Sequence, residues 1–314
     1  MKEYSIRIDG RSRLQRLLEV GEFVVTCELG PPQGAESGHL AEKARRVRGS
    51  VDACNLTDCT TAMVRLSSLA SSLIVQSEGV EAVMQITLRD RNRIGLQSDL
   101  LGASALGIRN VLCLYGDPPE AGNEKEAKPV YDISTTELIS CIRGMRDRGE
   151  LIGGGKLTHP PELFVGAAAT PLREDSSIRI ANVAKKVEAG AQFIQTQPVF
   201  DIDVFREFIA DMRSSGLTDR CRFIAGIMPI RSVRMAKHLK EKVHGITLPD
   251  GVLRRVEDAA DPAREGIRIA HETAAELKQV HGVSGIHIMT VAWEDVIPEI
   301  VEEAGLMPRP SPPG

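Results

Sequence analysis

Two acidic residues stand where short apolar segments end. Glu28 closes the segment VVTCE and precedes a Pro-Pro turn, and Asp117 follows LCLYG. A carboxyl group that is partly removed from water has a raised pKa and can deliver a proton near neutral pH. Glu28 is therefore a candidate proton donor, with a salt bridge at the protein surface as the alternative. Gly116 lets a ligand approach the backbone before Asp117, although an Asx turn would explain the same residues.

Three other polar features are candidate ligand contacts. The segment RDRNR, which begins at Arg89, precedes a helical pattern, and arginines at the start of a helix bind phosphate. The same segment could instead form a solvated rim of Arg–Asp pairs. Gln197 interrupts an apolar segment, where a buried amide needs a partner such as the edge of a heterocycle or a neighbouring backbone group. Lys186 lies in a helical pattern and is either a ligand contact or a surface lysine.

The common motifs for metal sites and nucleophiles are missing from the sequence. The six cysteines form no CxxC pair, the seven histidines form no HxH or HExxH, and no GxSxG is present. Cys27, Cys54, Cys113 and Cys221 adjoin apolar runs, which indicates buried, reduced thiols. A metal site assembled from distant cysteines is the alternative. We therefore expect no metal.

Composition excludes several classes of protein. The chain has 314 residues, of which 42% are hydrophobic and 26% charged, and its formal net charge is -4. A nucleic-acid-binding protein needs a basic face, and the aromatic content of 4% is low for a surface that stacks bases. No apolar stretch is long enough to span a bilayer, and the first ten residues lack the apolar core of a signal peptide. We expect a cytoplasmic protein that binds neither nucleic acid nor membrane.

Short β-branched segments alternate along the chain with segments of helical period. The expected strands begin at Phe23, Val51, Glu81, Asn110, Leu163, Gln192, Arg222 and Gly285. Eight strand–helix units over about 250 residues predict an α/β protein with a single-domain (β/α)8 TIM barrel. A doubly wound open sheet is the alternative, but no GxGxxG motif follows the first strand.

A barrel would bring the polar residues at its strand ends together, because function in this fold gathers at the carboxyl ends of the strands. These residues are Glu28, Thr57, Asp58, Gln85, Arg89, Asp117, Thr170, Gln195 and Gln197. We expect the catalytic barrel domain to span residues 1–305, with a long loop at 118–132 and a helical insertion at 248–280 between the seventh and eighth strands. Residues 306–314 form a proline-rich tail that we expect to be disordered, because proline lacks an amide hydrogen and restricts φ.

Five segments in this order carry a family resemblance: CELGPP, NLTD, LYGDPP, KKVEAGAQFIQTQPVFD and FIAGIMPI. Together they resemble the flavin-dependent methylenetetrahydrofolate reductases over roughly residues 20–305. Each motif alone is weak, and the specificity lies in their order and strand placement. The resemblance implies a (β/α)8 barrel and an oxidoreductase of one-carbon metabolism, which reduces 5,10-methylenetetrahydrofolate to 5-methyltetrahydrofolate.

The resemblance also implies roles for individual residues. In the family a glutamate protonates a folate ring nitrogen, so that the five-membered ring opens to an iminium that accepts hydride from a reduced flavin. Glu28 matches that glutamate. Asp117 matches an aspartate that contacts the pterin and tunes the flavin, and Gln197 matches a glutamine that contacts folate. Leu239 stands where a phenylalanine packs against folate. The positions that contact the flavin match Thr57, Gln85, Tyr115, Gly116, Asp117, Tyr131, Ala167, Asn182 and Lys186, to which the phosphate argument adds Arg89.

Several residues depart from the bacterial pattern of the family. Gln85 replaces a histidine, Tyr115 replaces an arginine, and Trp293 stands near another arginine position. The segment GAAATP lacks the tyrosine and histidine that help to hold the adenine end of FAD. Together with RDRN and LQSDLLGA, these changes resemble the catalytic subunit of acetogens, which can carry FMN and work with a small iron–sulfur and zinc subunit.

The resemblance therefore implies a flavin, with FAD as the family default and FMN as the alternative. It also implies NAD(P)H or another reduced donor, and a small iron–sulfur/zinc subunit or a second copy of the chain as candidate partners. Two other functions stay open. The chain could be a catalytic subunit that is active only in a larger electron-transfer complex, or a flavin-free barrel that binds a pterin.

Overall fold

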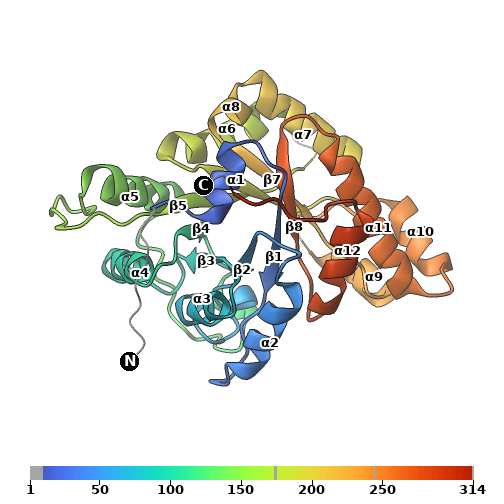
Figure 1. Cartoon of the computed structure of the whole chain (residues 1–314), viewed down its shortest axis with the longest axis horizontal. Coiled ribbons are helices and arrows are strands. Elements are labelled where there is room, and N and C mark those ends of the chain that lie inside the picture. The colour runs from blue at the N-terminus through green and yellow to red at the C-terminus, as the bar shows by residue number, and fades with distance from the viewer. Residues whose placement is uncertain (1–9, 173–174, 244, 313–314) are drawn as a thin grey trace.

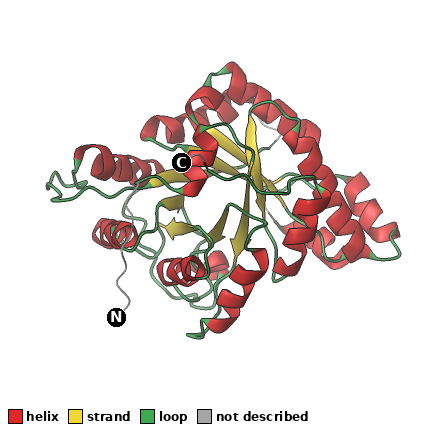
Figure 2. Cartoon of the chain, viewed as in Figure 1, coloured by secondary structure: helices red, strands yellow, loops and turns green. Residues whose placement is uncertain are grey.

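The computed structural model describes residues 10–172, 175–243 and 245–312. In this part of the chain, eight parallel strands form a closed barrel in chain order, and β8 pairs with β1. The strands are β1 (Val24–Leu29), β2 (Ala53–Leu56), β3 (Ala82–Thr87), β4 (Asn110–Leu114), β5 (Phe164–Ala169), β6 (Phe193–Pro198), β7 (Arg222–Ile227) and β8 (Val283–Ile288). Helices lie outside the strands (Figures 1 and 2). The predicted single-domain (β/α)8 barrel is confirmed.

Helices fill the crossovers between the strands. They are α1 (Arg13–Glu19), α2 (Gly38–Val47), α3 (Ser68–Ser77), α4 (Arg93–Ala105), α5 (Thr135–Arg148), α6 (Ser176–Ala189), α7 (Ile202–Ser214), α8 (Leu217–Arg220), α9 (Val233–Lys242), α10 (Asp250–Asp258), α11 (Pro262–Lys278) and α12 (Ile297–Glu303). Short 3₁₀ turns are η1 (Thr60–Ala62), η2 (Pro119–Ala121) and η3 (Glu294–Val296). The predicted loop at 118–132 contains only η2, and the predicted insertion before β8 contains α10 and α11. Within the described residues, none of the helices combines the length and the apolar character needed to cross a bilayer.

Alternation along each strand divides the side chains between the helices and the barrel interior. In β1, Val25, Cys27 and Leu29 are buried in the core that the helices cover. Thr26 and Glu28 point the other way, because successive residues of a strand face opposite sides of the sheet. The same alternation places a polar side chain inside the barrel at the end of several strands.

Helix α1 closes the amino-terminal end of the barrel. Its Leu14, Leu17 and Leu18 are buried in one cluster with inward-facing strand residues, among them Val24 and Phe193. This apolar layer excludes water from the lower half of the barrel. The polar residues near the carboxyl ends of the strands therefore lie above this apolar layer.

The carboxyl-terminal tail takes up a defined path over residues 306–312, so the expectation of disorder is wrong for these residues. Leu306 is buried, and the Arg309 guanidinium is paired with the fully buried Asp52. Arg309 also donates hydrogen bonds to the carbonyl groups of Phe23 and Leu306, both at 2.7 Å. These contacts hold the tail although its prolines prevent a helix. Residues 313–314 lie outside the described residues.

Candidate active site

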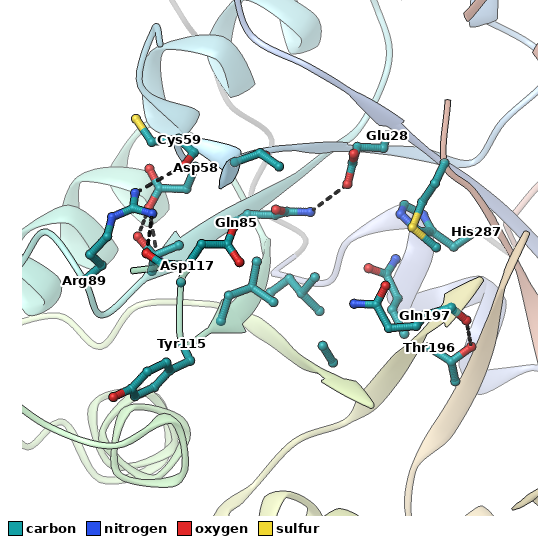
Figure 3. Close-up of a pocket in the computed structure, with 18 residues that line it drawn as sticks. Glu28, Asp58, Cys59, Gln85, Arg89, Tyr115, Asp117, Thr196, Gln197 and His287 are labelled. Atoms are coloured by element: carbon teal, nitrogen blue, oxygen red, sulfur yellow. Dashed lines mark hydrogen bonds between the residues drawn. The ribbon is translucent and has the colours of Figure 1, made fainter. Parts of the chain in front are cut away.

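A cavity of about 410 Å³ lies at the carboxyl ends of the strands (Figure 3). Cavities of this size commonly hold small molecules. One part of its lining comes from β2, β3, β4 and the loops after them, namely Asp58, Cys59, Thr60, Gln85, Thr87, Arg89, Leu112, Leu114, Tyr115, Gly116 and Asp117. The other part comes from β1, β5, β6 and β8 and their ends, namely Glu28, Ala168, Gln195, Thr196, Gln197, His287 and Met289. The structure thus brings Glu28, Asp117 and Gln197 to one cavity.

Glu28 projects into this cavity from the end of β1 (Figure 3). The pKa of its carboxyl group is raised to about 7, mainly by burial and to a smaller extent by the negative charge of Glu294. The side-chain amide of Gln85 lies 3.5 Å from Glu28 Oε2 and acts in the opposite direction. Glu28 consequently carries a proton below about pH 7, which is the state that a proton donor needs.

Glu294 is buried next to this region but is already paired. Its Oε1 lies 2.7 Å from Lys43 Nζ, and both side chains are mostly shielded from solvent. Lys43 comes from α2 and Glu294 from η3, so the ion pair connects the segments that follow β1 and β8.

The arginines at 89, 91 and 93 are all paired with aspartates. Arg89 pairs with Asp90, Arg91 with Asp58 and Arg93 with Asp132, at 2.7, 2.7 and 2.8 Å. Arg89 lines the cavity, and it also donates to the carbonyl groups of Asp117 and Cys59, at 3.1 and 3.3 Å. The segment therefore forms Arg–Asp pairs, as the alternative expects, but Arg89 is buried at the cavity and its role as a ligand contact stays a prediction. Arg89 also joins the loops after β2 and β4.

Asp58 organises the same rim, although sequence reasoning assigned it no role beyond its strand-end position. Its Oδ2 accepts hydrogen bonds from the backbone N–H and the hydroxyl group of Thr87, both at 2.9 Å. Arg91 donates to both of its carboxylate oxygens. The buried carboxylate thereby fixes the end of β3 against the loop after β2.

Asp117 lies at the mouth of the cavity and is exposed. Its Oδ2 accepts a hydrogen bond from the backbone N–H of Thr61 at 2.9 Å. Near it, Cys59, Thr61 and Ala62 have φ angles of 48°, 53° and 54°. Left-handed backbone is costly for residues with a Cβ, and such strain concentrates at ligand sites. The contact with Asp117 helps to hold this loop in its strained form.

Two tyrosines stack at the rim. The rings of Tyr115 and Tyr131 lie 4.4 Å apart and are nearly parallel, at 7°. The Tyr131 hydroxyl group donates to the carbonyl group of Gly116 at 3.2 Å. Gly116 has a φ of 93°, and a Cβ there would lie 3.1 Å from the Thr87 side chain, so this turn requires glycine. Tyr115 leaves much of its surface exposed beside the cavity.

A second hollow of about 390 Å³ lies behind β5, and it contains Asn182 and Lys186. Lys186 Nζ donates to the carbonyl group of Ala168 at 2.6 Å, and Ala168 lines the main cavity. Burial lowers the pKa of the Lys186 ammonium group. Arg179 and Lys185 also line this hollow. Arg179 is paired with Asp211, so Lys185 and Lys186 are the residues that make the hollow cationic.

Six predicted residues lie outside the lining of the main cavity as the described part of the chain forms it: Tyr131, Asn182 and Lys186, described above, and Thr57, Ala167 and Leu239. Thr57 is buried, and Ala167 packs under the helices with its side chain on the opposite face of β5 from Ala168. Leu239 lies in α9 and is buried in a separate apolar cluster. Trp293, near an arginine position of the family, carries the Arg231 guanidinium 5.6 Å above its ring.

A polar network forms the floor of the cavity, and sequence reasoning missed most of it. Asn55 Nδ2 donates to Gln195 Oε1 at 2.6 Å, and Gln195 Nε2 lies 3.3 Å from Thr26 Oγ1. Thr26 Oγ1 lies 2.9 Å from His287 Nδ1. A signal was available in the sequence, since each residue is a polar interruption within a largely apolar strand.

The site suits a planar heterocycle with hydrogen-bonding edges. Gln85 and Gln197 offer both donors and acceptors, and Leu112 and Leu114 supply apolar surface. The described residues contain no group of three or more His, Cys, Asp or Glu side chains that could hold a metal ion.

Comparison with known proteins gives relatives along nearly the whole chain. A methylenetetrahydrofolate reductase (NADH) 1 of Arabidopsis thaliana is 27% identical over 311 residues, covering 94% of this chain and 50% of the relative. A probable methylenetetrahydrofolate reductase (NADPH) of Caenorhabditis elegans is 26% identical, covering 94% of this chain and 44% of the relative. The chain therefore spans about half the length of these curated relatives.

Among solved structures, an uncharacterized protein from Clostridium thermocellum, which binds two copies of 5-methyl-5,6,7,8-tetrahydrofolic acid, superposes with a TM-score of 0.66. The two sequences are 15% identical, and the match covers 93% of this chain and 96% of the other, so the likeness concerns the fold. The model of one family, described as methylenetetrahydrofolate reductase, matches residues 13–305. Since that match takes in all eight strands and the entire cavity, the chain belongs to the methylenetetrahydrofolate reductase family.

Proposed function

We propose that this chain catalyses the flavin-dependent reduction of 5,10-methylenetetrahydrofolate to 5-methyltetrahydrofolate. The observation that carries the proposal is Glu28, whose carboxyl group faces the cavity and has a pKa of about 7. The reaction needs a proton at a folate nitrogen, and a group with this pKa can both hold and release one near neutral pH. Family membership supports the same reaction.

The residues of the cavity fit a flavin. The apolar side chains Leu112 and Leu114 and the amide of Gln85 suit the faces and the edge of an isoalloxazine ring. The cationic hollow behind β5, with Lys185 and Lys186, suits the phosphate that both FAD and FMN carry. A bound flavin would supply the hydride.

The protein's own residues would then bind, orient and protonate the substrate. Glu28 delivers a proton to the folate, and Gln85 orients the Glu28 carboxyl group. Gln197 lies across the cavity from Asp117 and can hydrogen-bond the edge of the pterin (Figure 3). Asp117 stands at the mouth, where its charge acts on both the pterin and the flavin.

The cofactor and donor can be identified in one experiment on the purified protein. Its visible spectrum is recorded, and the cofactor is released and identified by mass spectrometry. Loss of the flavin absorbance is then tested with NADH, NADPH and reduced ferredoxin. We expect a bound flavin, with FAD as the family default and FMN as the alternative. We also expect that methylenetetrahydrofolate reoxidises the reduced protein.

The outcomes separate the alternatives. A colourless protein that takes up no flavin would contradict the proposal and favour a flavin-free barrel that binds a pterin. A flavoprotein that none of the soluble donors reduces would instead favour a catalytic subunit that receives electrons in a larger complex, for example from an iron–sulfur subunit.

A further inference from the structure

His287 presents a ring nitrogen to the cavity. The residue lies in β8, is 2% exposed, and lines the cavity (Figure 3). Its Nδ1 lies 2.9 Å from Thr26 Oγ1. Within the described residues, no side chain or backbone group forms a hydrogen bond with Nε2, and this nitrogen is not among the buried side-chain atoms that lack a partner. The small exposed area of the ring therefore opens to the cavity.

The imidazole ring is neutral. Burial lowers the pKa of His287 to about 3. A neutral imidazole has one donor and one acceptor nitrogen, and Thr26 occupies Nδ1. One directional hydrogen-bonding position remains, at Nε2.

The floor network holds Thr26, the hydrogen-bond partner of His287 Nδ1. Gln195 Nε2 contacts both Thr26 Oγ1 and Asn55 Oδ1 at 3.3 Å, and its Oε1 accepts from Asn55. The side chains of Asn55, Gln195 and Thr26 are thus partnered by one another. A ligand that reaches Nε2 therefore adds a hydrogen bond at the one ring nitrogen that the network does not use.

The position of His287 indicates which ligand it meets. Glu28, Gln197 and Met289 belong to the same side of the cavity, formed by β1, β6 and β8. Gln85, Tyr115 and Gly116, which are assigned to the flavin by resemblance, lie on the side of β3 and β4. A ring that receives a proton from Glu28 therefore lies within the half of the cavity that His287 faces.

We infer that His287 is a substrate-binding residue whose Nε2 hydrogen-bonds the pterin ring of a reduced folate and holds it beside Glu28. This inference rests on the proposed function and adds to it a residue that recognises the substrate. Thr26 acts through His287 as a positioning residue.

Two substitutions separate substrate binding from a structural role. His287→Asn keeps an amide near the position of Nδ1, where it can contact Thr26, but has nothing near Nε2. His287→Gln reaches the position of Nε2 and gives up the contact with Thr26. The dissociation constant of 5-methyltetrahydrofolate is measured on the purified holoprotein by titration calorimetry, together with the flavin absorbance, the melting temperature and the kcat and KM of folate reduction.

We expect His287→Asn to weaken 5-methyltetrahydrofolate binding roughly tenfold while the flavin absorbance stays unchanged, since one buried hydrogen bond is lost. His287→Gln should bind within about threefold of the wild type. The inference is overturned if the Asn variant binds like the wild type while the Gln variant does not, because the ring then acts only through Thr26. It is also overturned if both variants bind like the wild type.

A measurement on the unmodified protein covers the case in which neither variant folds. In protein labelled with ¹⁵N-histidine, we expect the His287 imidazole to stay neutral at pH 5, because burial lowers its pKa to about 3. Saturating 5-methyltetrahydrofolate should shift its Nε2 resonance and leave Nδ1 nearly unchanged, whereas an unmoved Nε2 resonance would overturn the inference.

The same measurements distinguish a failure of the proposed function from a failure of the His287 assignment. A wild type that binds 5-methyltetrahydrofolate, but whose chemically reduced flavin is not reoxidised by methylenetetrahydrofolate, contradicts that function. The comparison of the two variants still decides the role of His287. A wild type with normal turnover and no effect of either variant contradicts the role of His287 alone. A wild type that binds no reduced folate overturns both.

Discussion

The protonation of Glu28 is decided by a competition among its neighbours. Burial is the largest influence on its pKa and favours the neutral carboxyl group. The hydrogen bond from Gln85 favours the carboxylate, but it is long, at 3.5 Å, and comes from an uncharged group. Glu294 adds repulsion, which is reduced because Lys43 pairs with it. Together these influences give the Glu28 carboxyl group a pKa of about 7.

Replacing Glu28 by glutamine tests its role as the proton donor. Glu28→Gln keeps the shape of the side chain and its contact with Gln85 but cannot deliver a proton. We expect normal flavin absorbance and a loss of roughly 10²–10⁴-fold in the rate of methylenetetrahydrofolate reduction, which is the usual range for a general acid. Stopped-flow reoxidation of the reduced protein measures this rate. Glu36→Gln, at an exposed position, is the control and should be unaffected; near-normal reduction by the Glu28 variant would remove Glu28 as the acid.

The same variant tests the raised pKa through stability. The Glu28 pKa rises from 4.5 to about 7 on folding, so between these values the folded state binds more protons than the unfolded state. Stability therefore falls as pH rises from about 4.5 to about 7 and is level above that. Glu28→Gln removes this loss. Relative to wild type, its free energy of unfolding should increase between pH 5 and pH 8 by on the order of 2–3 kcal/mol.

Urea denaturation at the two pH values measures this difference, and other buried acids cancel because both proteins contain them. An equal difference between variant and wild type at pH 5 and pH 8 would show that Glu28 titrates normally.

At the scale of secondary-structure elements, successive side chains of each strand point alternately to the helices and to the barrel interior, so adjacent residues have different roles. Cys27 packs under the helices, while Thr26 and Glu28 on either side of it serve the floor and the cavity. Closure of the barrel fixes how the strands meet, with Gly285 of β8 opposite Val24 of β1. A Cβ at Gly285 would lie 2.4 Å from the carbonyl oxygen of Val24. Glycine is therefore required where the last strand joins the first.

Gly285→Ala should weaken the closure of the barrel. The added methyl group collides with backbone that cannot move without separating β8 from β1, so we expect a loss of about 3 kcal/mol, at the upper end for overpacking. Gly102→Ala is the matched control, because a Cβ there meets nothing within 4 Å and the residue lies inside α4. It should raise stability by about 0.5–1 kcal/mol through helix propensity. Equal effects of the two changes in urea denaturation would contradict this account.

At the scale of the whole molecule, the two ends of the described chain meet at the closed end of the barrel. Asp52, which precedes β2, accepts hydrogen bonds from the Val25 backbone at 2.8 Å and from Arg13 at 2.9 Å. Arg309 adds its guanidinium to the same carboxylate at 3.2 Å. A fully buried carboxylate is stable only with such partners. The tail is thus a structural component of the barrel.

Arg309→Ala should destabilise the whole barrel. It leaves Asp52 with Arg13 as its cationic partner and also frees the carbonyl group of Phe23, so we expect a loss of about 2–4 kcal/mol in the free energy of unfolding. Arg11→Ala breaks the exposed pair with Glu19 and should cost less than about 0.5 kcal/mol. Thermal unfolding of both variants provides the comparison. A melting temperature of Arg309→Ala equal to that of the wild type would mean that the tail contributes nothing to the fold.

The sequence by itself determined the barrel and one main catalytic candidate. Eight apolar segments separated by helical patterns left few topologies, and right-handed parallel pairing then places Glu28, Gln85, Asp117 and Gln197 at one edge. This could be predicted because the residue pattern of each strand, and the succession of strands and helices along the chain, can be read from the sequence itself.

Only the tertiary structure decided which polar groups are already satisfied. The arginines at 89, 91 and 93 find aspartates, Leu239 joins a separate core, and Arg309 finds Asp52 across 257 positions of sequence. His287 was one of seven scattered histidines until folding placed Thr26 at one ring nitrogen and the cavity at the other. Hydrogen bonding and burial depend on neighbours that are distant in the chain, so residue type and spacing alone do not contain them.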